Sequence, residues 1–95
     1  LMEVFFTKKA KQAIDVIADF VESKNTNGSG NKFAIKFEQA IKQFAIDNAT
    51  YAKCNHNLLR VLGYSCITIS KWVVAFKIKD NKFIIYRIIW GSLLK

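Results

Sequence analysis

Apolar positions in the first half of the chain recur at intervals of three and four residues, the period of an amphipathic helix. The first stripe follows Thr7, which stands in an N-cap position, and predicts a helix over residues 8–24. Its members, which we expect to face the core, are Ala10, Ala13, Ile14, Ile17, Phe20 and Val21. A polar turn over residues 25–31 comes next. The second stripe comprises Phe33, Phe37, Ala40, Ile41, Phe44 and Ala45. Two amphipathic helices joined by a short polar turn predict an antiparallel helical hairpin.

Strand patterns lie on both sides of this hairpin. The apolar run Val4–Phe6 precedes it, and past residue 48 the apolar period changes to two, with many β-branched and aromatic residues. The predicted later strands are Leu58–Leu62, Tyr64–Ile69, Trp72–Lys79 and Phe83–Trp90. The fold class is therefore α+β: an N-terminal strand, a two-helix hairpin, and a three- to four-stranded antiparallel sheet with the helices on one face. The length fits a single domain over residues 1–95.

Strict alternation assigns the side chains of the last two strands to the two faces of the sheet. The helix-facing set is predicted to be Trp72, Val74, Phe76, Ile78, Ile84, Tyr86, Ile88 and Trp90. The open face is predicted to combine basic and apolar side chains, namely Lys77, Lys79, Arg87, Phe83, Ile85 and Ile89. A small domain seldom leaves such a mixed surface without a partner, so we expect this face to bind another molecule.

Positive charge is concentrated in the second half of the chain. The formal net charge of the whole chain is +8. Residues 1–52 hold seven basic and six acidic side chains, whereas residues 53–95 hold eight basic side chains against Asp80 alone. This field suits a partner with negative charge, and nucleic acid, an acidic protein and a membrane surface all fit that description.

The sequence predicts neither a membrane span nor a secretory signal. The longest apolar stretch, Phe83–Leu94, contains Arg87 and is shorter than the roughly 18 residues that a bilayer demands. The N-terminal residues lack the basic and long apolar segments of a signal peptide. We therefore expect a cytoplasmic protein without a membrane partner. Cys54 and Cys66 have the option of pairing, but two thiols in an unexported chain are more often reduced, and the sequence gives them no role.

Residues for catalysis or metal binding are few. His56, the single histidine, stands in the polar segment Asn55–Asn57 with no acidic residue beside it, so we interpret it as solvated and not as a general base. Its spacing from Cys54 and Cys66 is irregular and does not match a zinc motif. The sequence predicts no metal and no cofactor.

The chain resembles the RelE/ParE toxin superfamily over almost its whole length. The resemblance rests on the helix that opens with Lys8–Ile17, the segments Leu59–Leu62 and Trp72–Ile78, and the closing Ile84–Ser92. Its most specific parts are the pattern Leu-Arg-x-Leu and the final Arg-Ile-Ile-x-Gly-Ser. The resemblance implies a growth-inhibiting toxin of a type II toxin–antitoxin pair, of the plasmid stabilisation kind, that forms a hetero-oligomer with a cognate antitoxin.

Two mechanisms occur in that superfamily. RelE-like members cleave mRNA on the ribosome, and the candidate residues for this chemistry are Arg60, Arg87, Lys77 and Tyr64. ParE-like members act on DNA gyrase and are not nucleases. Two departures favour the ParE-like branch: Trp90 replaces the histidine that many relatives show before the glycine, and the tail Ser92–Lys95 lacks the basic and tyrosine residues of the ribosome-dependent nucleases. The resemblance thus favours a gyrase target and no enzymatic activity.

Six residues are predicted to contact the target or the antitoxin: Arg60, Lys77, Lys79, Phe83, Ile85 and Arg87. For Arg60 and Arg87 the structural alternative is capping of sheet edges or pairing with Asp47 or Asp80. An alternative of another class is a non-toxic nucleic-acid-binding module, whose sheet would contact the phosphate backbone through the basic members of this set.

Overall fold

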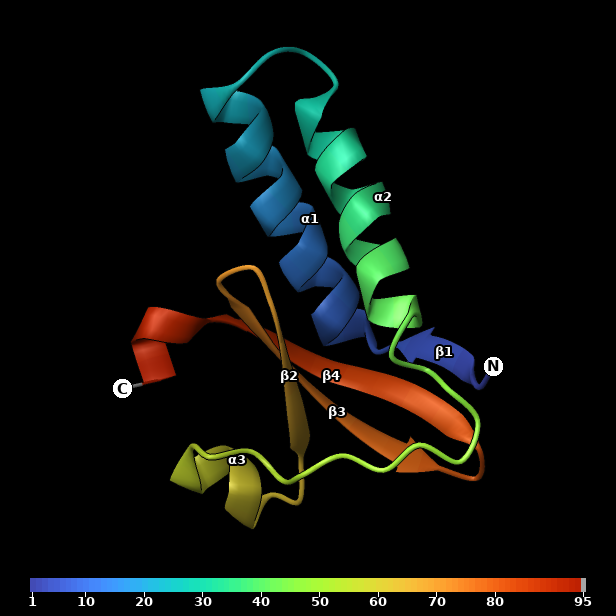
Figure 1. Ribbon diagram of the computed structural model, residues 1–95. Coiled ribbons are helices and arrows are strands. Elements are labelled where there is room, and N and C mark those ends of the chain that lie inside the picture. Colours follow the sequence, from blue (N-terminus) through green and yellow to red (C-terminus); the bar gives the residue numbers. More distant parts are fainter. Residues whose placement is uncertain (95) are drawn as a thin grey trace.

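Four strands and a helical hairpin make up the fold in the computed structural model, which describes residues 1–94 (Figure 1). The elements in chain order are β1 (Glu3–Phe6), α1 (Lys8–Lys24), α2 (Ser29–Lys42), α3 (Asn57–Val61), β2 (Ser65–Ile69), β3 (Trp72–Lys79), β4 (Lys82–Trp90) and the 3₁₀ helix η1 (Gly91–Leu94). The strand order is β1-β4-β3-β2. The predicted α+β class is confirmed, except that β1 pairs with β4 in parallel, so the sheet is mixed. Within residues 1–94 no helix combines the length and apolar character of a membrane span.

The helical hairpin begins with the predicted cap and joins its two helices through a side chain of α1. Thr7 Oγ1 accepts a hydrogen bond from the backbone N–H of Ala10 at 3.1 Å. The second helix starts at Ser29, not near Phe33 as predicted, and ends at Lys42. It starts early because the carboxylate of Glu22 accepts hydrogen bonds from backbone N–H groups at the beginning of α2.

The main core lies between the hairpin and the sheet. Its fully buried side chains come from both helices and from the two central strands: Ile14, Ile41, Val74, Phe76, Phe83 and Ile85. Tyr51, in the segment that follows α2, packs edge-to-face against Phe76 and Phe83, and its hydroxyl donates to the carbonyl of Phe44 at 2.6 Å. The segment between α2 and β2 is thereby fixed to the core at Tyr51.

A bulge in β4 overturns part of the predicted face assignment. Ala75 of β3 pairs with Arg87, and the next residue, Phe76, pairs with Ile85, so Tyr86 is the extra residue. Because the extra residue reverses the alternation, Phe83 and Ile85 point into the helix-facing core, and both are 0% exposed. Predicting Phe83 and Ile85 on the open face was therefore wrong.

The bulge exchanges other positions as well. Ile84 pairs with Lys77 and shares its face, so Ile84 and Tyr86 belong to the open face and not to the helix-facing set. On the C-terminal side of the bulge, the predicted helix-facing position of Ile88 is confirmed, because Ile88 is buried in the main core.

The predicted strand Leu58–Leu62 is wrong, because this segment forms the short helix α3 and a C-terminal turn. Within residues 1–94, the outer edge of β2 makes one isolated bridge, between Lys53 and Ser65. The Leu58–Leu62 segment satisfies its backbone groups locally instead, for example by the hydrogen bond from Arg60 N–H to the carbonyl of His56 at 2.9 Å. Leu59 is buried outside the main core, while Leu58 and Val61 are exposed.

Cys54 and Cys66 form a disulfide, with their Cα atoms 4.8 Å apart. The expectation of two reduced thiols is therefore corrected by the structure. The disulfide joins the segment before α3 to β2, and the backbone N–H of Cys54 also donates to the carbonyl of Tyr64 at 3.0 Å. These two links fold the 54–64 segment back against the sheet.

Candidate functional site

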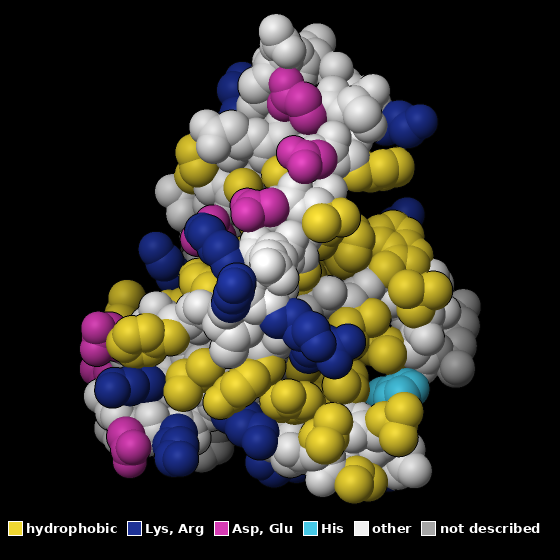
Figure 2. Space-filling model, turned by 180° about the vertical axis from the view of Figure 1, so that it is seen from behind, with side chains coloured by type: hydrophobic (Ala, Val, Ile, Leu, Met, Phe, Trp, Pro, Cys, Tyr) yellow, Lys and Arg dark blue, Asp and Glu magenta, His cyan; other side chains and the backbone are white. Residues whose placement is uncertain are grey.

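Basic and hydrophobic side chains are interleaved on the side of the molecule opposite the view of Figure 1. Figure 2 shows lysine and arginine side chains among hydrophobic ones over the lower part of the molecule, where the sheet and α3 lie. Most acidic side chains in that view lie along the helical hairpin or at one edge. This separation of basic from acidic side chains agrees with the concentration of positive charge in residues 53–95.

Lys77 lies beside a pair of adjacent tyrosines on the open face of the sheet. Its Nζ atom is 5.1 Å from the centre of the Tyr64 ring and 5.7 Å from that of Tyr86, and the two rings are 5.4 Å apart. Cation–π attraction to both rings holds the ammonium group at this place. The sequence pointed to Lys77 and Tyr64, but it missed Tyr86, because only the bulge turns that residue to this face.

The two arginines lie elsewhere. Arg60 is exposed on α3, where its Nη2 donates to Asn57 Oδ1 at 3.2 Å. Arg87 is exposed on β4 and lines a groove beside α1 together with Lys9. Within residues 1–94 the ion pairs join the amino group of Leu1 to Asp47 and Lys11 to Glu38, so neither arginine has the carboxylate partner that the structural alternative required.

The candidate residues therefore do not form one cluster. Lys77 and Tyr64 lie together, Arg60 and Arg87 stand on different elements, and Lys79 is exposed near the end of β3. Phe83 and Ile85 lie in the core, where no partner reaches them.

An apolar groove, which the sequence pattern did not predict, runs along α1 beside the ends of β3 and β4. The groove has a volume of about 490 Å³ and is lined by Val16, Ile17, Phe20, Trp72, Trp90 and Leu93. The rings of Trp72 and Trp90 pack edge-to-face with centroids 4.9 Å apart. Phe20, which the helical pattern placed in the core, is 62% exposed. The signal in the sequence was Val16, an apolar residue outside the predicted stripe.

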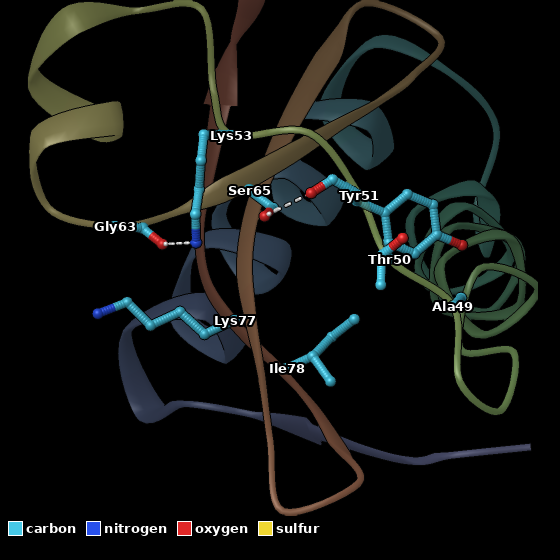
Figure 3. A pocket seen from close by; sticks show the side chains of 8 residues that line it. All are labelled: Ala49, Thr50, Tyr51, Lys53, Gly63, Ser65, Lys77 and Ile78. Carbon is cyan, nitrogen blue, oxygen red and sulfur yellow. Dashed lines mark hydrogen bonds between the residues drawn. The ribbon is translucent and has the colours of Figure 1, made fainter.

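A second cleft, of about 390 Å³, has Lys77 in its lining (Figure 3). Its lining residues are Ala49, Thr50, Tyr51, Lys53, Gly63, Ser65, Lys77 and Ile78. Lys53 Nζ donates a hydrogen bond to the carbonyl oxygen of Gly63 at 3.0 Å. In Figure 3, Lys53, Gly63 and Lys77 lie at one side of the cleft and Thr50 at the other, with Ile78 between them.

Comparison with known protein families decides the assignment. A family model described as the ParE toxin of a type II toxin–antitoxin system, parDE, matches residues 4–92. The chain belongs to the ParE toxin family. The match runs from the second residue of β1 to the start of η1 and so covers the hairpin and all of the sheet except Glu3. A search among curated proteins found no match.

Membership of the ParE toxin family confirms the superfamily that the sequence resembles, and it implies a cognate antitoxin as a partner. In this ParE toxin the cysteines are not available as zinc ligands, because they are bonded to each other. His56 precedes α3 and is half-buried, not fully solvated as predicted, and its buried Nδ1 has no hydrogen-bond partner among the described residues.

Proposed function

We propose that this ParE toxin inhibits bacterial growth by acting on DNA gyrase in the cytoplasm, and that a cognate antitoxin neutralises it. The family match over residues 4–92 is the observation that carries the proposal. The net charge of +7 over residues 53–95 adds support, because a positive surface favours approach to the DNA-bound state of such a target.

The positions of the nuclease candidates support a mechanism without RNA cleavage. General acid–base cleavage of a phosphodiester requires its proton-transfer groups within hydrogen-bond reach of one substrate. Arg60 stands on α3, Arg87 lies beside α1, and Lys77 lies against two adjacent tyrosine rings. A single substrate phosphate would have to bridge these separate places.

The apolar groove along α1 supports a role in antitoxin binding. Val16, Phe20 and Leu93 are exposed large apolar side chains, and such a cluster favours an amphipathic segment of a protein partner. Lys9 and Arg87 line the continuation of the groove, where they would face acidic side chains of that segment.

A RelE-like mRNA endoribonuclease is the second candidate function. The observation that favours it is the cluster of Lys77 with Tyr64 and Tyr86, because an ammonium group suits the contact with an RNA phosphate and aromatic rings suit stacking on RNA bases.

One set of assays separates these functions. Purified toxin is added to a DNA supercoiling reaction with gyrase, and separately to a translation reaction with ribosomes and a defined mRNA. We expect inhibited supercoiling with accumulation of cleaved DNA, and an intact mRNA. Cleaved mRNA with normal supercoiling would establish the RelE-like function instead. Activity in neither assay, with salt-sensitive binding to nucleic acid, would favour the non-toxic binding module.

The antitoxin part is tested by expression with and without the neighbouring reading frame. Growth inhibition is expected only when the toxin is expressed alone. Phe20→Ser should leave inhibition unchanged but weaken its neutralisation. Ile35→Ser is the matched control, because Ile35 is exposed on α2 and does not line the groove. Equal neutralisation of both variants would remove the groove from the antitoxin interface.

A further inference from the structure

We propose that the cleft beside Gly63 is a binding site for a phosphate group, with Lys53 and Lys77 as its ligands. The proposal goes beyond the gyrase target and does not depend on it. Both ammonium groups approach the same residue: Lys53 Nζ is 3.0 Å from the Gly63 carbonyl oxygen, and a Cβ atom at Gly63 would lie 3.8 Å from Lys77 Nζ. An anion placed beside Gly63 would therefore be close to two positive charges.

The two lysines lack counter-charges within the part of the chain that the structure describes. None of the eight lining residues is acidic, and neither Lys53 nor Lys77 belongs to the ion pairs of residues 1–94. An ammonium group has three N–H donors, and Lys53 uses one of them on Gly63. The remaining donors are free to bind an external oxyanion.

The cleft offers hydrogen-bond donors, and two of its carbonyl acceptors are already paired within the protein. The carbonyl of Gly63 is occupied by Lys53, and the carbonyl of Tyr51 accepts a hydrogen bond from Ser65 Oγ at 3.4 Å. Carbonyl oxygens repel an anion unless they are paired, so these two bonds remove a cost of anion binding. Thr50 adds an exposed hydroxyl donor at the opposite side of the cleft.

The backbone around Lys53 is held in place before any ligand binds. Lys53 forms a β-bridge with Ser65, its neighbour Cys54 is bonded to Cys66, and Tyr51 is packed into the core. Gly63 has φ +84°, a left-handed conformation that suits glycine, and this conformation sets the direction of its carbonyl. A fixed site loses less conformational entropy on binding, which favours a small ligand.

Charge and size select a phosphate. The volume of about 390 Å³ exceeds that of one phosphate and leaves room for an attached sugar. The shared chemistry is the phosphate oxyanion, which is carried either by free phosphate or by the backbone of a single-stranded nucleic acid. The neighbouring rings of Tyr64 and Tyr86 would lie next to the sugar or base of the second source.

The test follows the backbone amide of Gly63 by NMR while the intact protein is titrated at constant ionic strength. The probes are inorganic phosphate and hexathymidylate, and thymidine is the neutral control. We expect a saturable shift of the Gly63 signal with at least one phosphate-bearing probe and none with thymidine. Similar affinities for inorganic phosphate and for hexathymidylate identify the free anion as the ligand. An affinity for hexathymidylate that is at least about tenfold higher than that for phosphate identifies the nucleic-acid backbone.

Variants separate the cleft from the general positive charge. Lys53→Gln and Lys77→Gln should each weaken binding about tenfold, because each removes one charge-assisted contact. Lys71→Gln is the matched control, since Lys71 is exposed in the turn between β2 and β3, outside the cleft, and should change the affinity less than about twofold. Lys77→Gln keeps the test valid if loss of the Lys53 bond to Gly63 impairs folding. No shift up to about 10 mM of either phosphate-bearing probe, or equal weakening by all three variants, would overturn the proposal.

Discussion

Glu22 on α1 and Gly30 in the first turn of α2 are joined by a hydrogen bond, in which the backbone N–H of Gly30 donates to Glu22 Oε1 at 2.8 Å. The other oxygen, Oε2, accepts from the N–H of Gly28, also at 2.8 Å. One carboxylate therefore satisfies two backbone N–H groups at a helix start whose N-cap, Gly28, has no side chain for this purpose. These bonds, from Gly30 first and then from Gly28, lower the pKa of Glu22 from its usual value of 4.5.

Glu22→Gln should therefore reduce stability in a pH-dependent manner. Because the folded-state pKa is below the unfolded value, the stabilisation is complete above the usual value of 4.5 and is lost as pH falls through the lowered pKa. We expect the variant to melt at a lower temperature than the parent at pH 7, with the difference shrinking towards pH 3. Glu3→Gln, which removes a carboxylate outside these bonds, serves as the control. A difference that grows at low pH would contradict this role of Glu22.

Gly30→Ala should destabilise the hairpin. A Cβ atom at Gly30 would overlap with the carbonyl oxygen of Ala18 on α1, so the two helices would have to move apart. Overpacking of this kind costs about 1 to 3 kcal/mol, which urea denaturation can measure. Gly28 has open space at its Cβ position, although its φ of +87° adds strain of another kind. Unchanged stability of the Gly30 variant would mean that the helices do not approach here.

Phe37→Ala should cost about 3 to 5 kcal/mol of the free energy of unfolding and leave little soluble protein. Phe37 is 4% exposed in the main core and stacks on Phe33. Phe20→Ala is the matched control, because Phe20 is 62% exposed and should cost less than about 1 kcal/mol. Denaturation midpoints of the two variants give the comparison, and a near-neutral effect at Phe37 would contradict the position of α2.

The double variant Cys54→Ser/Cys66→Ser should lose about 2 to 3 kcal/mol, since the disulfide closes a short loop in the unfolded chain. Part of this loss of stability should be confined to the region of α3 and appear there as faster hydrogen exchange, because the disulfide joins the segment before α3 to β2. A reducing agent should have the same effect on the parent protein and no effect on the double variant. Equal stability in oxidised and reduced form would show that the 54–64 segment is held by its other contacts.

Charge reversal at Arg60 and Arg87 together should abolish growth inhibition while the protein stays folded. Both side chains are exposed and lack carboxylate partners within residues 1–94, so each change should alter stability by less than about 0.5 kcal/mol. Reversal of Lys32 and Lys36 on α2 changes the net charge equally and should leave inhibition intact. Growth curves after induction and circular dichroism give the two readouts. Undiminished toxicity of the arginine variant would remove both residues from the mechanism.

The sequence placed some candidate site residues correctly and misplaced others, for local reasons. Lys77 and Tyr64 were predicted as candidates and do meet on the open face. The pair Asp80-Asn81 is typical of a two-residue hairpin turn, and both residues have positive φ. Phe83 and Ile85 were misplaced because a single bulge at Tyr86 reverses the alternation, and no residue type marks that bulge in the sequence. α3 was misplaced because a short apolar run has no period that separates a strand from a helix.

By itself the sequence determined the order of the long elements, the helical hairpin, the concentration of positive charge in residues 53–95, and the resemblance that the family match confirms. These properties depend on composition and on periodicity over many residues, which a linear chain displays directly. Only the tertiary structure decided that Lys77 contacts both Tyr64 and Tyr86, that Cys54 meets Cys66, and that Val16 and Trp90 share a groove. Those contacts join distant segments, and one residue of strand register or one turn of helix is enough to remove them.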